Sequence, residues 1–213
     1  MMAKKYELIY ADPPWEYKVW SRKGRGRSAE SHYDTMRLED LKAMQVPGMC
    51  AKDCVLLLWA TGPGLSAAIE LGVAWGFVYK TVAFVWVKKN RHDDRFFMGL
   101  GYYTRANAEW VLLFTKGRPL PRVRNDLGQV VVARVGRHSQ KPAEIRTKIV
   151  ELFGDRARVE LFARSRQGFF PNDEYQGWDV FGNEVAGSIE LKSDLNKMKY
   201  GDDRDEEGGK GVE

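Results

Sequence analysis

Residues 6–15 read YELIYADPPW, and this stretch decides which fold the chain is expected to adopt. It opens as a short apolar run and ends at Asp12, which is followed by Pro13 and Pro14. A proline pair cannot continue a central strand, because proline has no backbone N–H to donate to a neighbouring strand. We therefore expect a buried strand that stops at Asp12 and presents Trp15 just beyond its end.

The rest of the chain alternates similar apolar runs with stretches of helical periodicity. Further strands are expected over residues 54–59, 81–87, 110–114 and 159–162. Helices are expected over residues 37–45, 65–71 and 142–153. Nearly continuous apolar runs are typical of strands that are buried on both faces of a parallel sheet. The alternation predicts an α/β fold in which a mostly parallel sheet carries helices on both faces.

Length and composition restrict the class of protein. The chain has 213 residues, of which 44% are hydrophobic and 12% aromatic, which is enough for a sizeable core and too much for a disordered chain. We expect one domain over residues 1–186 and an acidic, poorly ordered tail over residues 187–213. The longest apolar runs are far shorter than the roughly 20 residues that cross a bilayer, and no export signal is recognisable. We expect a cytoplasmic protein without a membrane partner.

The cysteines and histidines show no pattern of a metal site. Cys50 and Cys54 are too few for a disulfide framework, and His32, His92 and His138 are scattered. We expect both cysteines to be reduced and to lie in or near the core, and we expect no metal.

The charge is distributed unevenly, and this asymmetry indicates a polyanionic partner. The net charge is +5, but residues 201–213 hold six acidic and two basic residues, so residues 1–200 carry +9. Basic residues cluster in residues 22–27, 88–95 and 116–124, each expected in a loop at a strand end. Such a balance favours nucleic acid through phosphate contacts, although a solvated basic surface would show the same composition.

The tetrapeptide at residues 12–15 suits an amino group conjugated to a ring. Ligands of α/β sheets bind beyond the carboxyl ends of the strands, where Asp12 and the loops after Trp59 and Val87 are expected to meet. The rigid prolines can direct the carboxylate and a main-chain carbonyl at one point, so that an amino group with two N–H donors finds two acceptors. Trp15 could stack on a base. The alternative is a structural turn with a capping aspartate and a core tryptophan.

The order of motifs resembles the MT-A70-like family of S-adenosylmethionine-dependent adenine N6-methyltransferases, which act on DNA and RNA. The resemblance covers residues 6–185. It rests on residues 12–15, 32–33, 36, 75–77, 79–81, 86–88, 99–105, 138–142, 160–164, 177–179 and 182–184. It implies a Rossmann-like methyltransferase fold with permuted motif order, since the catalytic motif precedes the cofactor strand. One departure is the absence of a Gly-x-Gly loop, because Phe162-Ala163-Arg164 follows that strand.

The resemblance implies a site-specific DNA (adenine-N6) methyltransferase of bacterial or phage type, with S-adenosylmethionine as cofactor. RNA adenine methylation and a non-catalytic nucleic-acid-binding subunit on the same scaffold are the alternatives. The implied catalytic residues are Asp12, Pro13, Pro14 and Trp15. Cofactor contacts are expected from Ser139, Lys141, Glu160, Phe162, Arg164, Asn183 and Glu184. Substrate contacts are expected from Arg22, Lys23, Arg25, Arg27, Tyr33, Arg105 and Asn107, with Glu109 nearby.

Two of these residues carry specific expectations. The resemblance implies that Glu160 accepts the ribose hydroxyls of the cofactor, because a carboxylate inside a strand requires partners. The alternative for Glu160 is a pair with Arg158 or Arg164. Lys141, just before a helix, is expected to reach the carboxylate of the cofactor.

Overall fold

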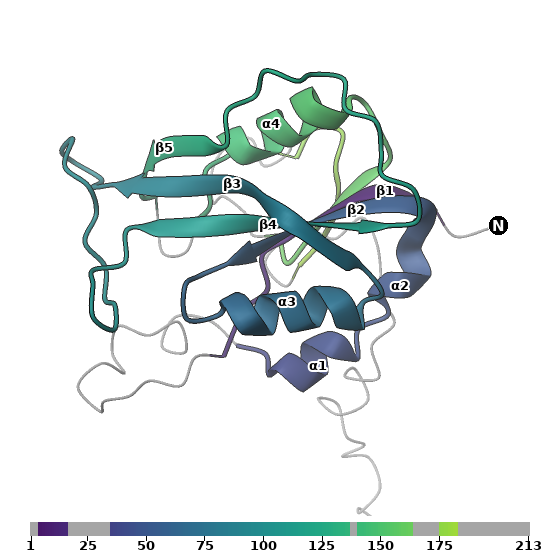
Figure 1. Cartoon of the computed structure of the whole chain (residues 1–213), viewed down its shortest axis with the longest axis horizontal. Coiled ribbons are helices and arrows are strands. Elements are labelled where there is room, and N and C mark those ends of the chain that lie inside the picture. The colour runs from purple at the N-terminus through teal and green to yellow at the C-terminus, as the bar shows by residue number, and fades with distance from the viewer. Residues whose placement is uncertain (1–3, 17–34, 137–139, 164–174, 183–213) are drawn as a thin grey trace, which may run out of the picture.

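The computed structural model describes residues 4–16, 35–136, 140–163 and 175–182, and these residues form one sheet covered by helices (Figure 1). The strand order is β5-β3-β4-β2-β1-β6-β7. The strands are β1 (Tyr6–Ala11), β2 (Cys50–Ala60), β3 (Val78–Lys89), β4 (Ala108–Lys116), β5 (Val130–Arg134), β6 (Arg158–Leu161) and β7 (Asp179–Phe181). The helices are α1 (Leu38–Lys42), α2 (Val46–Met49), α3 (Leu65–Ala74) and α4 (Glu144–Phe153).

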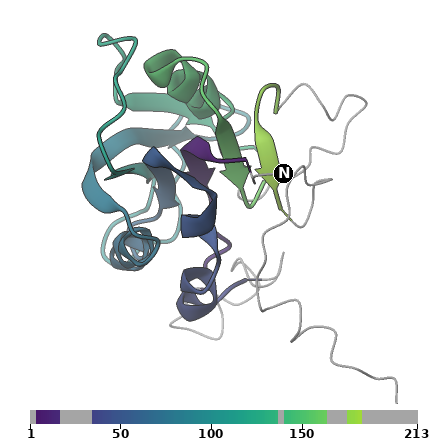
Figure 2. The ribbon, with the colours of Figure 1, turned by 90° about the vertical axis from the view of Figure 1, so that its right-hand side faces the viewer.

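The sheet is mostly parallel, as expected, and β4 is the strand that runs against the others. β1 pairs in parallel with β2 and β6, β6 with β7, and β3 with β5, whereas β4 is antiparallel to both β2 and β3. The reason is the connection from β3 to β4, which contains no crossover helix, so the chain returns beside the strand it has just left. As a consequence, the start of β4 lies at the carboxyl edge of the other six strands. Figure 2 shows β6 and β7 at the far margin of the sheet.

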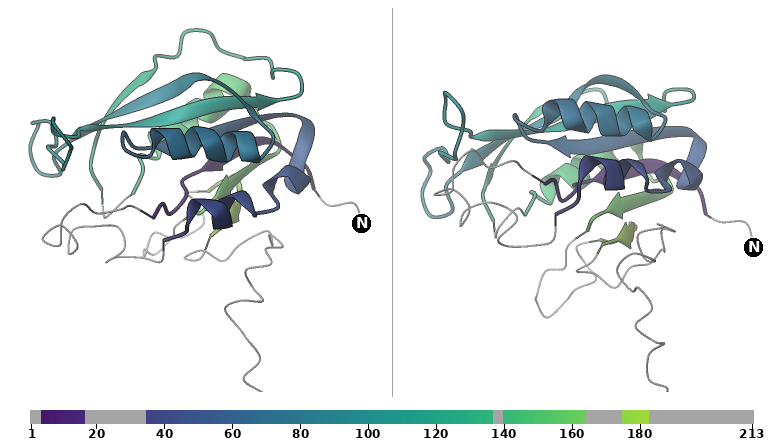
Figure 3. Two further views of the ribbon diagram at one scale, coloured as in Figure 1. Left: turned by 60° about the horizontal axis from the view of Figure 1, so that its bottom comes forward. Right: turned by 90° about the horizontal axis from the view of Figure 1, so that it is seen from below.

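Helices cover both faces, and α3 and α4 each bury apolar residues against the sheet. On one face, α1 and α3 lie side by side (Figure 3), and α3 buries Ala68 and Leu71 against a core that includes Ile9. On the other face, α4 buries Ile145, Ile149 and Phe153. Side chains alternate between the two faces along each strand.

Tyr10, Trp59, Trp86 and Val111 all belong to the core on the α4 face. Side chains two residues away from these on the same strand therefore point to that face as well. This rule determines which polar side chains meet at the carboxyl edge.

The five strands and three helices expected from the sequence are confirmed, and three elements were not anticipated. β5 was missed although residues 130–132 are three consecutive valines, and it is an edge strand in which Val131 is buried while Val130 and Val132 are exposed. β7 has 3 residues and α2 has 4, too few for a periodic pattern. α4 ends before Gly154, whose φ of 78° is a backbone angle that glycine adopts readily.

Other expectations concern the remainder of the chain. Cys50 and Cys54 are free and buried, as expected. None of the helices within the described residues has the length and hydrophobicity of a membrane span. The boundary at residue 187 and the acidic tail lie outside the residues that the structure describes.

Candidate active site

Asp12 stands at the carboxyl end of β1, in the centre of the sheet edge. Its backbone N–H donates to the carbonyl of Leu161 at 3.4 Å, so it remains beside the end of β6. The two prolines then turn the chain, because the Trp15 N–H donates to the Pro13 carbonyl at 2.9 Å. The Pro14 carbonyl accepts from the backbone N–H of Met36 at 2.8 Å. Each carbonyl retains a second lone pair for another donor.

Trp15 lies in the core on the α1 and α3 face, with 8% of its surface exposed. The structure therefore places Trp15 in the core, as expected if the tetrapeptide were only a structural turn. Stacking of Trp15 on a base stays a prediction.

Four side chains of alternating charge lie along the edge, and we call them the charge chain: Asp12, Lys141, Glu109 and Lys88. The Lys141 Nζ atom is 2.8 Å from the Asp12 Oδ2 atom and 3.4 Å from the Glu109 Oε2 atom. Lys88 pairs with the other oxygen of Glu109. The four side chains keep only 14% to 17% of their surface exposed. A neutral, water-poor network therefore joins β1, the start of α4, β4 and β3.

The environment of Glu109 keeps this carboxylate ionised. Burial by itself would raise the pKa of Glu109, but the ammonium groups of Lys141 and Lys88 outweigh it and hold that pKa below its ordinary value. Aromatic faces support both cations, since Lys141 Nζ lies 5.2 Å from the Trp59 ring centroid and Lys88 Nζ 4.8 Å from that of Trp86.

Glu160 is buried on the same face, and its partner is Arg146 of α4. The Arg146 Nε atom donates to Glu160 Oε2, and Nη2 lies 3.3 Å from Oε1. Burial would lower the pKa of Arg146, but Glu160 raises it above its ordinary value. The alternative pair with Arg158 is wrong, because Arg158 binds Asp155 at 2.6 Å.

Sequence reasoning missed Arg146. The signal for it was a charged residue on the apolar face of α4, between Ile145 and Ile149.

Tyr10 stands opposite Glu160 in the register of β1 and β6. Burial, followed by the nearby charge of Glu160, raises the pKa of Tyr10 well above its ordinary value, so the phenol stays protonated. Its oxygen accepts a hydrogen bond of 2.6 Å from the Trp59 indole. The phenol thus links Trp59, below Lys141, to the neighbourhood of Glu160.

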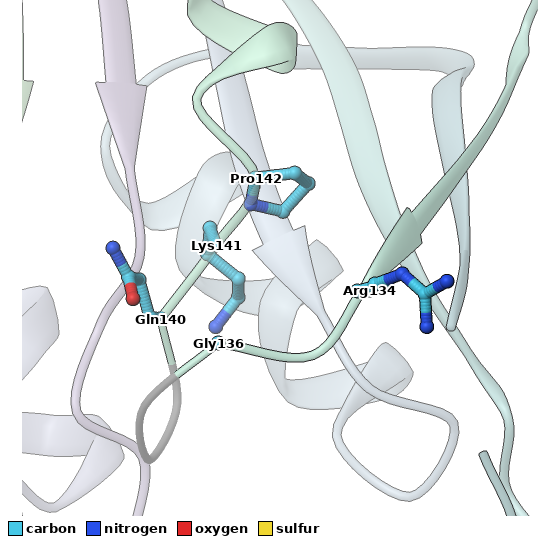
Figure 4. A pocket seen from close by; sticks show the side chains of 5 residues that line it. All are labelled: Arg134, Gly136, Gln140, Lys141 and Pro142. Atoms are coloured by element: carbon cyan, nitrogen blue, oxygen red, sulfur yellow. The ribbon is translucent and has the colours of Figure 1, made fainter. Parts of the chain in front are cut away.

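A small pocket opens beside Lys141, between the end of β5 and the start of α4 (Figure 4). It has a volume of about 120 Å³ and is lined by Arg134, Gly136, Gln140, Lys141 and Pro142. Arg134 turns its guanidinium away from Lys141, toward Asp94 at 2.9 Å. Whole-ligand sites usually have about 300–1,000 Å³, so this pocket suits one polar end of a ligand.

Phe162 follows β6 in a left-handed backbone conformation, with φ of 63°. This is the conformation for which glycine is the usual residue. The sequence lacks glycine here, yet the backbone takes a glycine-like turn, and the Phe162 ring packs against Phe181 with centroids 6.4 Å apart. Strained backbone of this kind is common at functional sites.

Arg105 and Asn107 lie in the β3–β4 loop at the same edge as Asp12. Arg105 is exposed, and the carbonyl of Asn107 accepts from the Lys88 N–H at 2.9 Å. The other expected contacts lie outside the described residues: Arg22, Lys23, Arg25, Arg27, Tyr33, Ser139, Arg164, Asn183 and Glu184.

Two basic clusters can be located, and both differ from a simple phosphate-binding surface. In residues 88–95, Arg95 binds Asp93 at 2.8 Å and Lys89 lies 3.4 Å from Asp94. Residues 116–124 begin at the opposite edge of the sheet, where the Arg118 N–H donates to Asp53 at 2.7 Å.

Comparison with known proteins shows the family of the chain. The MT-A70 family model matches residues 6–184. The chain is 37% identical over 198 residues to the type II methyltransferase M.MunI of Mycoplasma sp., covering 85% of this chain and 78% of that protein. It is 27% identical over 202 residues to the N(6)-adenosine-methyltransferase catalytic subunit METTL3 of Homo sapiens, covering 93% of this chain but 32% of that protein. The chain belongs to the MT-A70 family of S-adenosylmethionine-dependent adenine N6-methyltransferases.

Proposed function

We propose that this chain transfers a methyl group from S-adenosylmethionine to the exocyclic N6 amino group of adenine in DNA. The observation that carries the proposal is the ion pair of Asp12 and Lys141 at the carboxyl edge of the sheet. The identity to a type II methyltransferase, the class that modifies DNA, favours DNA. The lower identity to METTL3 makes RNA adenine the second candidate.

The residues at this edge fit the cofactor by charge. S-adenosylmethionine supplies an electrophilic methyl group on a sulfonium, and its amino acid end carries one ammonium and one carboxylate. Lys141, which lines the small pocket, would bind the carboxylate of the cofactor. The acidic partners of Lys141 would accept hydrogen bonds from N–H groups of the ligands. Glu160 would reach ribose hydroxyls only with oxygen lone pairs that Arg146 leaves available.

Asp12 acts in this proposal by orientation. Its carboxylate accepts one N–H of the adenine amino group, and the second lone pair of the Pro13 or Pro14 carbonyl accepts the other. Lys141 is close to both carboxylates, so it can move toward Glu109 when Asp12 takes up this new donor. Asp12 need not be a strong base, because the nitrogen becomes acidic once it carries the methyl group. Holding the amino group in line with the donor contributes through near-attack geometry.

The test measures methyl transfer to separate DNA and RNA pools with labelled S-adenosylmethionine, followed by digestion to nucleosides. We expect N6-methyladenine from the DNA pool. Asp12→Ala should lower the rate at least ~100-fold, because it removes the orienting acceptor. Asp126→Ala, a loop carboxylate paired with Arg124, is the control and should retain the wild-type rate.

Two outcomes would contradict this proposal. Methyladenine from the RNA pool alone would favour the second candidate. Cofactor binding by calorimetry without transfer to either pool would indicate a non-catalytic subunit.

A further inference from the structure

The β3–β4 loop carries a compact hairpin at residues 96–106, which we call the aromatic hairpin (left of Figure 1). Its two arms meet where the Gly99 N–H donates to the Ala106 carbonyl at 2.8 Å. The glycines are required, since a Cβ atom at Gly101 would lie 1.8 Å from the Thr104 carbonyl oxygen. The sequence therefore builds this turn in advance of any partner.

The aromatic hairpin exposes an unusual amount of apolar surface. Phe96, Met98 and Leu100 alternate along one arm and are 52%, 62% and 65% exposed. At the tip, Tyr102 and Tyr103 are 86% and 94% exposed, with their rings edge to face and centroids 5.0 Å apart. Neighbouring exposed apolar side chains of this number mark an interaction site.

Position and charge favour nucleic acid as the partner. The aromatic hairpin extends from the end of β3 and the start of β4, which is the edge that carries Asp12 and Glu109. Residues 96–107 contain Arg105 and no acidic residue, and residues 88–107, in which Arg95 pairs with Asp93, carry a net charge of +3. Aromatic faces among cations suit unpaired bases and their phosphates, because every base has a π face.

We propose that the aromatic hairpin stacks, through Tyr102 and Tyr103, on unpaired bases that neighbour the target adenine in the same strand. This inference rests on the proposed function, because it concerns bases next to the target adenine. It implies that these bases are unstacked from one another in the bound substrate. The phenyl rings supply the binding, and the hydroxyl groups are dispensable. Arg105 is exposed two residues after Tyr103 and would bind the connecting phosphate.

The experiment measures binding of a single-stranded oligodeoxynucleotide that carries 2-aminopurine next to an adenine. Stacking on an aromatic ring quenches 2-aminopurine fluorescence. The Tyr102→Ala/Tyr103→Ala variant should bind at least about tenfold more weakly and lose the quenching. Tyr102→Phe/Tyr103→Phe should stay within about threefold of wild type, because the stacking face is retained. Val78→Ala, an exposed apolar residue at the opposite edge, should leave both readings unchanged.

Two further readings separate the alternatives. The Kd for S-adenosylmethionine should be the same in all variants, and sedimentation should show the same molecular mass. A double alanine variant that binds and quenches like wild type overturns the inference. So does one whose effect is a loss of self-association, since the hairpin would then be a protein interface. Binding and quenching require no methyl transfer, so a wild type that quenches without methylating contradicts the proposed function and leaves this inference supported.

Discussion

Within the charge chain, Glu109 is the residue that two cations share. One oxygen of Glu109 binds Lys141 and the other binds Lys88. Glu109 therefore connects Lys141, the partner of Asp12, to strand β3. Without Glu109, Lys141 would have Asp12 as its acidic partner in the charge chain. Glu109 thus tunes how readily Lys141 leaves Asp12.

Glu109→Gln should change how stability depends on pH. The pKa of Glu109 in the folded protein lies below its ordinary value of 4.5, so its ion pairs contribute fully above about pH 4.5 and are lost as the pH falls through the folded pKa. The variant lacks this contribution, so its deficit in unfolding free energy should shrink as the pH falls below about 4.5. Urea titrations at several pH values measure it. Glu39→Gln, an exposed residue, should match wild type throughout, and a constant deficit for Glu109→Gln would contradict the expectation.

At position 162, the glycine variant should be more stable than the alanine variant, which is the reverse of the usual order. Both Phe162→Ala and Phe162→Gly remove the ring that packs on Phe181, but only glycine relieves the left-handed φ of 63°. A left-handed conformation costs a residue with a Cβ atom about 1–2 kcal/mol. The glycine variant should therefore unfold at higher urea concentration than the alanine variant, against the entropic preference for alanine elsewhere. Equal stability of the two variants would show that this turn is unstrained.

At the scale of elements, the apolar runs predicted the buried strands, because burial on both faces leaves a pattern in sequence. The direction of β4 did not follow from its composition, since it depends on the connection that precedes it. That direction brings Glu109 to the site. The partner of Glu160 could not be predicted for a similar reason: it depends on how α4 is rotated on the sheet, and that rotation is fixed by Ile145 and Ile149 together. Asp12, in contrast, was predictable because the prolines fix the strand end.

The Arg146–Glu160 pair joins α4 to β6, and its loss should lower the unfolding free energy of the protein. Arg146→Met leaves the buried Glu160 carboxylate without its cation, which should cost about 3–5 kcal/mol of unfolding free energy. Adding Glu160→Met should recover most of this loss, because no buried charge remains. Lys148→Met on the same helix, whose pair with Glu144 spans 3.8 Å, is the control and should change stability by less than about 0.5 kcal/mol. A double variant as unstable as the single one would mean that Arg146 acts through packing alone.

At the scale of the whole molecule, the net charge of +5 does not indicate where a nucleic acid binds, but the placement of the arginines does. Arg91 and Arg105 are exposed in the β3–β4 loop at the edge of Asp12, whereas Arg118 and Arg122 are exposed in the segment after β4, beyond the opposite edge. A nucleic acid strand bound at the site can reach Arg91 and Arg105 but not Arg118 and Arg122. The two pairs therefore separate directed phosphate binding from general attraction to a basic protein.

Arg91→Ala/Arg105→Ala should weaken binding of a single-stranded oligodeoxynucleotide and reduce its dependence on salt. Each phosphate contact on a single strand contributes about 0.7 to the slope of log K against log salt, so the loss of two contacts should reduce the slope by about 1.4. Arg118→Ala/Arg122→Ala removes the same charge from the opposite edge and should leave the slope unchanged. Titrations between 50 and 300 mM salt with both double variants measure the difference. Equal reductions in the two variants would mean that nucleic acid responds to the net charge of the protein, and that the edge of Asp12 has no preferred path for the phosphate backbone.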